Sequence, residues 1–215
     1  MAKKSSIYKT LPFDLVAIGQ AFGIVQQEKC THLDNWLSAD YELNIVEQTV
    51  LNDLHADVSQ TSDAMNEEEL KARLVGLLFY AARIDLPNKI RVFYERPISA
   101  IIDGYDLAVI CDCMVATPMF SLPVQPYFFL QEFKKAKGEK KDPEAQMLMA
   151  MLISQHLNID NKPVYGGYLI GDVCHFTTLI GKDYCVSRPF YAGRKDDLFK
   201  MASILRKLQD IILNR

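Results

Sequence analysis

The sequence lacks the features that would place the protein in a membrane or outside the cell. Hydrophobic residues make up 49% of the 215 residues, yet no apolar run reaches the roughly 18 residues that a membrane-spanning helix needs. Residues 1–6 include two lysines but lack the apolar stretch of a signal peptide. We therefore expect a cytoplasmic protein without membrane contact. Its composition is typical of a single globular domain with a sizeable core.

Motifs of several common enzyme classes are also absent. The chain has no G-x-S-x-G nucleophile motif, no phosphate-binding loop and no dinucleotide fingerprint. Its four histidines have no mutual spacing that suggests a set of ligands. Candidate chemistry must therefore come from carboxylates and lysines.

Cysteine is scarce and odd in number, which argues against a disulfide framework. The five cysteines are Cys30, Cys111, Cys113, Cys174 and Cys185. A zinc site would join the C-x-C pair to a later cysteine and His175, but structural zinc sites usually separate paired cysteines by two to four residues. Because positions i and i+2 of a strand share a face, Cys111 and Cys113 are expected to pack together in a core. We predict buried free thiols and a reducing compartment.

Neither sign of charge dominates the whole chain, but the charges are unevenly distributed. The formal net charge is -3, which taken alone argues against a protein that coats nucleic acid. Residues 1–70 carry 4 basic and 12 acidic side chains, whereas residues 71–215 carry 20 and 15. An anionic partner is therefore expected to bind the part of the chain after Leu70.

The first part of the chain has helical periodicity. An apolar stretch covers residues 13–25, and the spacing of Trp36 and the leucines and valines after it predicts a helix over 31–58. A polar break follows at residues 59–63. We divide the chain into an N-terminal helical extension, residues 1–62, and a main domain, residues 63–215, and expect them to form one compact unit.

The main domain has the predicted element order α-β-β-β-α-β-β-α. Helices are predicted over 66–83, 142–157 and 195–213. Strands are predicted over 90–102, 105–116, 127–134, 164–170 and 174–180, with a short one over 184–187. Asp103-Gly104 is a favoured two-residue hairpin turn, and three prolines predict a loop over 117–126. Asp142 suits the N-cap of its helix. Gly166-Gly167 indicates a bulge or close packing.

An acid interrupts each of two strands that are expected to be neighbours. Glu132 follows an aromatic run, and Asp112 is the lone acid of the apolar segment 107–116. If the connecting loop is centred on Leu122, residues whose numbers sum to 244 face each other, and Asp112 lies opposite Glu132. The Cβ atoms of directly opposite residues lie about 4.5–5.5 Å apart. Two carboxylates this close repel unless a cation or proton lies between them. We therefore predict a Mg²⁺ or Mn²⁺ site. The alternative is a strand end in solvent, with Glu132 and Lys134 as a surface pair.

Three further polar residues fit such a site. Lys134 lies two positions after Glu132, on the same strand face, where it could hold a nucleophilic water or a phosphate oxygen. Glu67 lies on the inward stripe of the helix 66–83, although a first-turn acid also complements the helix dipole. Gln146 lies in the first turn of the helix 142–157, where the alternative is an ordinary solvent-facing glutamine.

A cluster of lysines follows the third strand. It consists of Lys134, Lys135, Lys137, Lys140 and Lys141, with one acid among eight residues. Such a cluster could hold a nucleic-acid backbone, or it could be a solvated loop before a helix.

These residues and elements resemble the restriction-endonuclease-like nucleases that bear the PD-(D/E)XK signature, whose core is α-β-β-β-α-β. The resemblance covers roughly residues 66–180. In detail, the sequence looks like a little-characterised bacterial group of that superfamily. The segments that carry this likeness are NEEELKARLVGLL, FYERPISA, DCMVA, PYFFLQEFKK, DPEAQMLMAML and KPVYGGYLIGDVCHF.

The resemblance implies a fold, a set of roles and a reaction. The fold would be an α+β domain with a central mixed sheet flanked by helices. Asp112, Glu132 and the main-chain carbonyl of Phe133 would hold Mg²⁺ or Mn²⁺, with Lys134 as the catalytic lysine. Glu67 would be an accessory acid and metal ligand, and Gln146 the glutamine of exonuclease-like branches. Cysteine stands at position 111, where the signature has proline.

Two functions of different class follow from these expectations. The first is a metal-dependent nuclease that hydrolyses phosphodiester bonds in DNA. The second is a non-catalytic module that keeps the nuclease fold and serves binding or assembly. In either case, residues 1–62 are a candidate surface for a homodimer or a partner protein.

Overall fold

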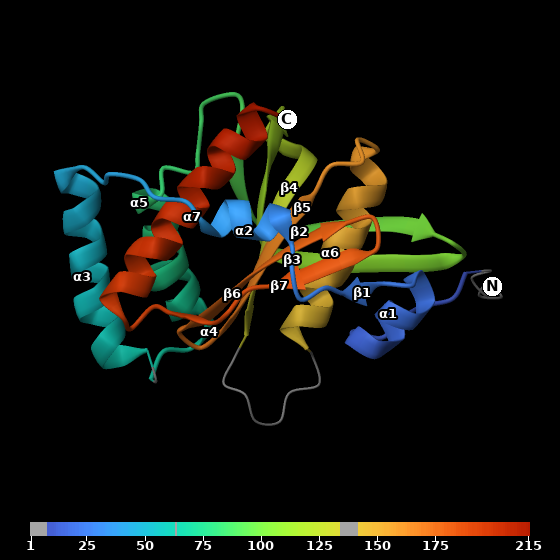
Figure 1. Ribbon diagram of the computed structural model, residues 1–215, viewed down its shortest axis with the longest axis horizontal. Helices are drawn as coiled ribbons and strands as arrows, with labels where there is room; N and C mark the ends of the chain where they lie inside the picture. The colour runs from blue at the N-terminus through green and yellow to red at the C-terminus, as the bar shows by residue number, and fades with distance from the viewer. Residues whose placement is uncertain (1–7, 63, 134–141) are drawn as a thin grey trace, which may run out of the picture.

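A central mixed sheet with helices on both faces forms the body of the protein (Figure 1). The computed structural model describes residues 8–62, 64–133 and 142–215, with the backbone alone for Gln131, Glu132 and Phe133. The predicted mixed α/β class with a helix-flanked central sheet is confirmed.

The helices follow the local signals closely in the second half of the chain. They are α1 Leu15–Phe22, α2 Thr31–Leu37, α3 Ile45–Thr61, α4 Glu67–Glu69, the π-helix η1 Leu70–Val75, α5 Gly76–Ala81, α6 Pro143–Asn158 and α7 Lys195–Leu213. At the start of α6, the Asp142 side chain accepts hydrogen bonds from the backbone N–H groups of Glu144 and Ala145, as the N-cap prediction requires.

The single helix predicted over 31–58 is wrong, because two helices occupy this stretch. α2 ends at Leu37 and α3 begins at Ile45. Asn44 caps α3, and its backbone N–H donates to the Glu47 carboxylate in a reciprocal capping box. The cap satisfies donors that a continuous helix would have satisfied internally, so the chain turns here.

The sheet has the strand order β1-β7-β6-β5-β4-β3-β2, and β8 pairs with β6. The strands are β1 Val25–Gln26, β2 Arg91–Ile102, β3 Tyr105–Met119, β4 Leu122–Phe133, β5 Val164–Ile170, β6 Val173–Ile180, β7 Asp183–Val186 and β8 Phe190–Tyr191. β2, β3 and β4 form an antiparallel meander, and α6 leads to β5, which is parallel to β4. The predicted turn at Asp103-Gly104 is confirmed, with positive φ at both residues.

The loop predicted over 117–126 is wrong, because β3 and β4 continue through it to a tight turn at Phe120-Ser121. β2 pairs with β3 only as far as Ala116, and β5 pairs with β4 only from Phe128 onward. The prolines at 118, 123 and 126 therefore lie where their strands have only one neighbour. A strand edge tolerates a residue without an N–H donor, so these prolines do not end the hairpin.

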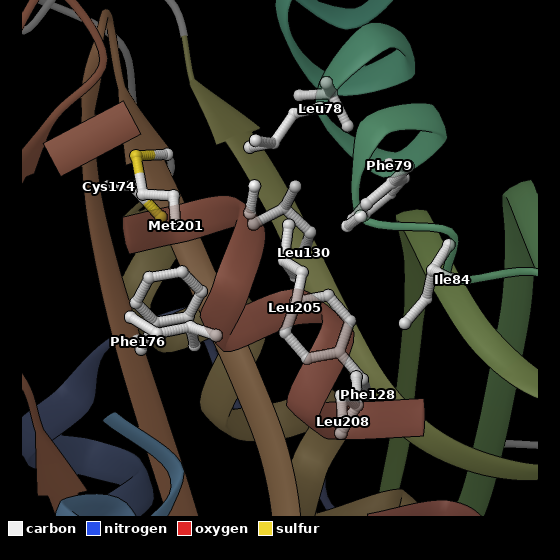
Figure 2. Packing of buried hydrophobic residues seen from close by; sticks show 14 of the residues in the cluster. Leu78, Phe79, Ile84, Phe128, Leu130, Cys174, Phe176, Met201, Leu205 and Leu208 are labelled. Atoms are coloured by element: carbon white, nitrogen blue, oxygen red, sulfur yellow. The ribbon is translucent and has the colours of Figure 1, made fainter. Parts of the chain in front are cut away.

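Two hydrophobic clusters cover the two faces of the sheet. One joins the sheet to α2, α3, α5 and α7, and the other joins it to α6 and α1. Figure 1 shows α3, α5 and α7 gathered on one side and α6 with α1 on the other. Figure 2 shows how Leu78 of α5, Leu130 of β4, and Met201 and Leu205 of α7 meet in the first cluster.

Trp36 of α2 lies at the centre of the first cluster and is fully buried. Its indole N–H donates to the main-chain carbonyl of Ile204 in α7 at 2.7 Å. Its ring makes edge-to-face contacts with Phe128, Tyr165 and Phe176, with centroids 5.0 to 6.0 Å apart. The N-terminal segment therefore supplies a central side chain of the core that lies beneath the sheet.

The expectation of five free thiols is wrong for one pair. Cys30 and Cys185 form a disulfide, with their Cα atoms 6.3 Å apart. β1 runs parallel to β7, and this pairing brings together two segments that are 155 residues apart in sequence. Cys111, Cys113 and Cys174 are buried thiols outside this disulfide, as predicted. Cysteine usage therefore no longer supports a reducing compartment.

Of the helices in the described ranges, none combines the length and apolar character that crossing a bilayer requires.

Candidate functional site

Asp112 lies in β3 at a point where the regular alternation of side chains between the two faces of the sheet is interrupted. Before it, Cys111 packs in the cluster beneath α6; after it, Cys113 packs in the cluster beneath α5 and α7. The two cysteines therefore lie on opposite faces, and the prediction that they share one is wrong. The β2–β3 ladder passes from the pair Tyr94–Cys113 to the pair Arg96–Cys111, without pairing the residues between them.

The residue beside Asp112 in β2 is Glu95, and its backbone is unusual. It has φ of 50°, a left-handed conformation that non-glycine residues seldom adopt within a strand. Such a local irregularity bends a strand and redirects its side chains. It lets the side chains of Glu95 and Asp112 reach the same helix.

That helix begins at α4 and continues through η1, where Lys71 lies. The Lys71 ammonium is 2.5 Å from Glu95 Oε1 and 3.7 Å from Asp112 Oδ1. The backbone N–H of Gly76 bonds to the carbonyl of Lys71, five residues earlier, as in a π-helix. The structure thus places a lysine, which the sequence analysis did not predict, beside Asp112.

Glu67 begins this helix, one turn before Lys71, and is half-buried. The two acids that follow it are more exposed. Glu68 is exposed, and Glu69 forms a capping box with Asn66, donating its backbone N–H to Oδ1 of Asn66 at 3.0 Å. Of the three acids in this turn, Glu67 is the least exposed, and its role at the site stays a prediction.

The end of β4 lies beside this part of β3. The pair closest to the site is Cys113–Leu130, whereas the predicted register would pair Cys113 with Gln131. The predicted register is therefore wrong by one residue at the end of the described ladder, which does not include Asp112. The physical reason is that the turn lies at Phe120-Ser121 and that two irregularities shift the β3–β4 register.

The backbone of Glu132 and Phe133 forms the last two pairs of β4 with β5. The predicted roles of the Glu132 side chain, Lys134 and the lysines at 135, 137, 140 and 141 fall outside the described residues. They remain predictions.

Gln146 lies on the opposite face of the sheet from the helix that carries Glu67. It is half-buried in the first turn of α6, whose apolar residues pack in the cluster with α1. The contacts among described residues do not join its side chain to Asp112. The structure therefore brings Asp112 together with Lys71 of the 67–81 helix, and the predicted role of Gln146 stays a prediction.

The surroundings of Asp112 have low polarity on one side. Burial raises the pKa of the Cys111 thiol, and the charge of Asp112 raises it further. The Asp112 side chain is 16% exposed and that of Lys71 is 12% exposed. In such surroundings a carboxylate needs a cation close to it.

The oxygen donors present suit a hard divalent cation, but the described ones do not form a complete set. Among the side chains that the structure describes, no three of His, Cys, Asp or Glu are arranged to hold a metal ion. The carboxylate of Asp112 and the main-chain carbonyl of Phe133 are donors of the type that Mg²⁺ and Mn²⁺ prefer. A complete set would need the carboxylate of Glu132 as well.

Two residues of this site were missed by the sequence analysis. Lys71 lies four positions after Glu67 and so shares its helix face, a spacing that could have identified it. Glu95 is a charge within a predicted strand, but nothing in the sequence marks its left-handed backbone.

Comparison with known proteins does not assign the chain to a family. No family model matches it, and a search of curated proteins finds no match. The function must therefore be argued from the residues and their arrangement.

Proposed function

We propose that the protein is a metal-dependent nuclease that hydrolyses phosphodiester bonds in DNA. The observation that carries the proposal is the position of Asp112. It is a nearly buried acid where the side-chain alternation of β3 is interrupted, beside the end of β4, and the 67–81 helix reaches it through Lys71. The element order from this helix through β5 agrees with the α-β-β-β-α-β core of the PD-(D/E)XK nucleases that the sequence resembles.

The residues of the chain have distinct roles in this proposal. Asp112 and Glu132, with the main-chain carbonyl of Phe133, would hold Mg²⁺ or Mn²⁺, and Glu67 would be an accessory acid. The bound ion would supply Lewis-acid stabilisation of the phosphate charge. Lys134 would orient the attacking water and neutralise charge on the phosphate oxygens.

The charge distribution supports an anionic substrate. Residues 71–215 carry 20 basic and 15 acidic side chains, and the lysines at 135, 137, 140 and 141 follow β4 directly. Contacts of this kind with the backbone are electrostatic and independent of sequence. We therefore expect cleavage that weakens steeply as the salt concentration rises.

The experiment is a cleavage assay with matched variants. Purified protein is incubated with supercoiled plasmid, linear duplex, single-stranded DNA and RNA, in Mg²⁺, in Mn²⁺ and in EDTA. Lys134→Ala is expected to lower the rate about 100-fold or more, as for loss of a group that handles a proton in the reaction. Asp112→Asn is expected to abolish cleavage, because it removes a metal ligand.

Two control variants distinguish the effect of changing a proposed site residue from the effect of removing a surface charge. Asp106→Asn changes an exposed acid of the same strand, and Lys89→Ala changes an exposed lysine outside it. Both are expected to cleave like the wild type. If the wild type cleaves none of the four substrates in either metal, the nuclease proposal is refuted and the non-catalytic alternative is favoured.

A homodimer or partner surface within residues 1–62 is part of the same proposal. Val16, Val25, Ile45 and Val46 are exposed on this segment, with 51% to 75% of their surface accessible, although Trp36 of the same segment is buried. Light scattering at high protein concentration tests the dimer, and a strict monomer would contradict it.

A further inference from the structure

Three irregularities of the backbone converge on three charged residues. Glu95 has a left-handed φ in β2, the side-chain alternation of β3 is interrupted at Asp112, and Lys71 lies in a π-helical segment. Irregularities of each kind cost free energy and are concentrated at functional sites. Their common effect is to place one ammonium group between two carboxylates.

The two carboxylates differ in their access to solvent. The Asp112 side chain is 16% exposed and Lys71 is 12% exposed, whereas Glu95 is 57% exposed. Lys71 is also closer to Glu95, at 2.5 Å, than to Asp112, at 3.7 Å. The exposed acid therefore anchors the ammonium, while the nearly buried acid is the one that has more to gain from a nearby cation.

We propose that Lys71 is a positioning residue, a cation that the protein itself supplies to Asp112, and that a divalent metal ion must compete with it for that carboxylate. This inference rests on the proposed function, because it takes Asp112 as a metal ligand. Glu95 of β2 holds the ammonium away from Asp112 when the metal binds. Without Glu95, Lys71 would associate more closely with Asp112.

The proposal gives opposite expectations for two substitutions. Lys71→Met removes the competing charge and is expected to raise the affinity for Mn²⁺ about tenfold, equivalent to about 1.4 kcal/mol. Glu95→Gln releases Lys71 toward Asp112 and is expected to lower that affinity severalfold. A purely structural ion pair would not give changes of opposite sign.

The experiment is a calorimetric titration of the full chain with Mn²⁺ alone. The set comprises the wild type, Lys71→Met, Lys71→Arg, Glu95→Gln, Asp112→Asn and the exposed control Lys89→Met. Lys71→Arg keeps the charge and is expected to bind Mn²⁺ like the wild type, as is Lys89→Met. If Lys71→Met binds no tighter than Lys89→Met, the proposal is overturned. If Lys71→Met does not fold, Glu95→Gln decides, and unchanged affinity in that variant overturns the proposal.

The outcomes separate this inference from the proposed function. Binding that is lost in Asp112→Asn but unaltered in Lys71→Met and Glu95→Gln refutes the role of Lys71 and leaves the metal site standing. Absence of Mn²⁺ binding in every protein, wild type included, refutes both. A double-mutant cycle of Lys71→Met and Asp112→Asn, unfolded in EDTA, tests the metal-free contact by itself. Additive effects would overturn the proposal.

Discussion

Glu47 of α3 is the most buried carboxylate among the described residues, and its replacement by glutamine should destabilise the protein in a pH-dependent way. Its side chain is 3% exposed and bonds to Arg83 at 3.2 Å and to Arg206 at 3.0 Å. Burial tends to raise its pKa, but the backbone N–H of Asn44 and the two arginines lower it below the ordinary value of 4.5. The carboxylate thus ties α3 to α7 and to the end of α5.

The magnitude follows from these contacts. A hydrogen bond to a charged group contributes about 1.5–3 kcal/mol, but Arg83 and Arg206 are 47% and 29% exposed, so solvent weakens both pairs. We expect Glu47→Gln to lower the free energy of unfolding by about 2 kcal/mol near neutral pH. Because the pKa of Glu47 is lowered by folding, its contribution is full above pH 4.5 and is lost as the pH falls through the folded pKa.

Urea unfolding of the wild type and Glu47→Gln over a range of pH measures this difference, with the exposed Glu42→Gln as the matched control. The pKa values of Asp160 and Asp197 are also lowered. Because both proteins contain these groups, their contributions cancel in the difference in unfolding free energy between wild type and Glu47→Gln. The difference should vanish in acid, where Glu47 is protonated. A difference that stays constant with pH would refute the reasoning, because it would assign the effect to packing instead of charge.

Two further substitutions test the packing and the cross-link. Gly166→Ala should lower the free energy of unfolding by about 1–3 kcal/mol, since an added Cβ would lie 2.5 Å from Sδ of Met147 and 2.9 Å from Oγ1 of Thr177; urea unfolding with unchanged stability would show that α6 can shift. Cys30→Ser should lower it by about 2–5 kcal/mol, because it opens a cross-link between segments 155 residues apart. The stability of Cys30→Ser should not respond to a reductant, whereas that of the wild type should fall; equal responses would contradict the bond to Cys185.

The local elements were predictable from the sequence where capping and periodicity act over a few residues. Asp142 marked the start of α6, the amphipathic pattern of α7 predicted Lys195–Leu213, and Asp103-Gly104 predicted the first hairpin turn. The close packing at Gly166 was one of two alternatives that the glycine pair indicated, the other being a bulge.

The arrangement of the site could not be predicted in the same way. The register of β3 with β4 depends on two irregularities that shift it; prolines lie beside both, but a proline does not specify by how many residues the register shifts. Lys71 reaches Asp112 because three backbone irregularities act together, which is a property of the assembled sheet and helix. The disulfide of Cys30 depends on β1 pairing with β7, and the two cysteines are 155 residues apart in sequence.

Diffraction from crystals grown with Mn²⁺ tests most directly whether Asp112 lies in a metal site at the end of β4. We expect an anomalous scattering peak about 2.0–2.6 Å from a carboxylate oxygen of Asp112 and from the main-chain carbonyl of Phe133, the range of hard-cation distances to oxygen. Data that show no Mn²⁺ at Asp112, or place the ion only at other residues, would contradict the proposed metal site.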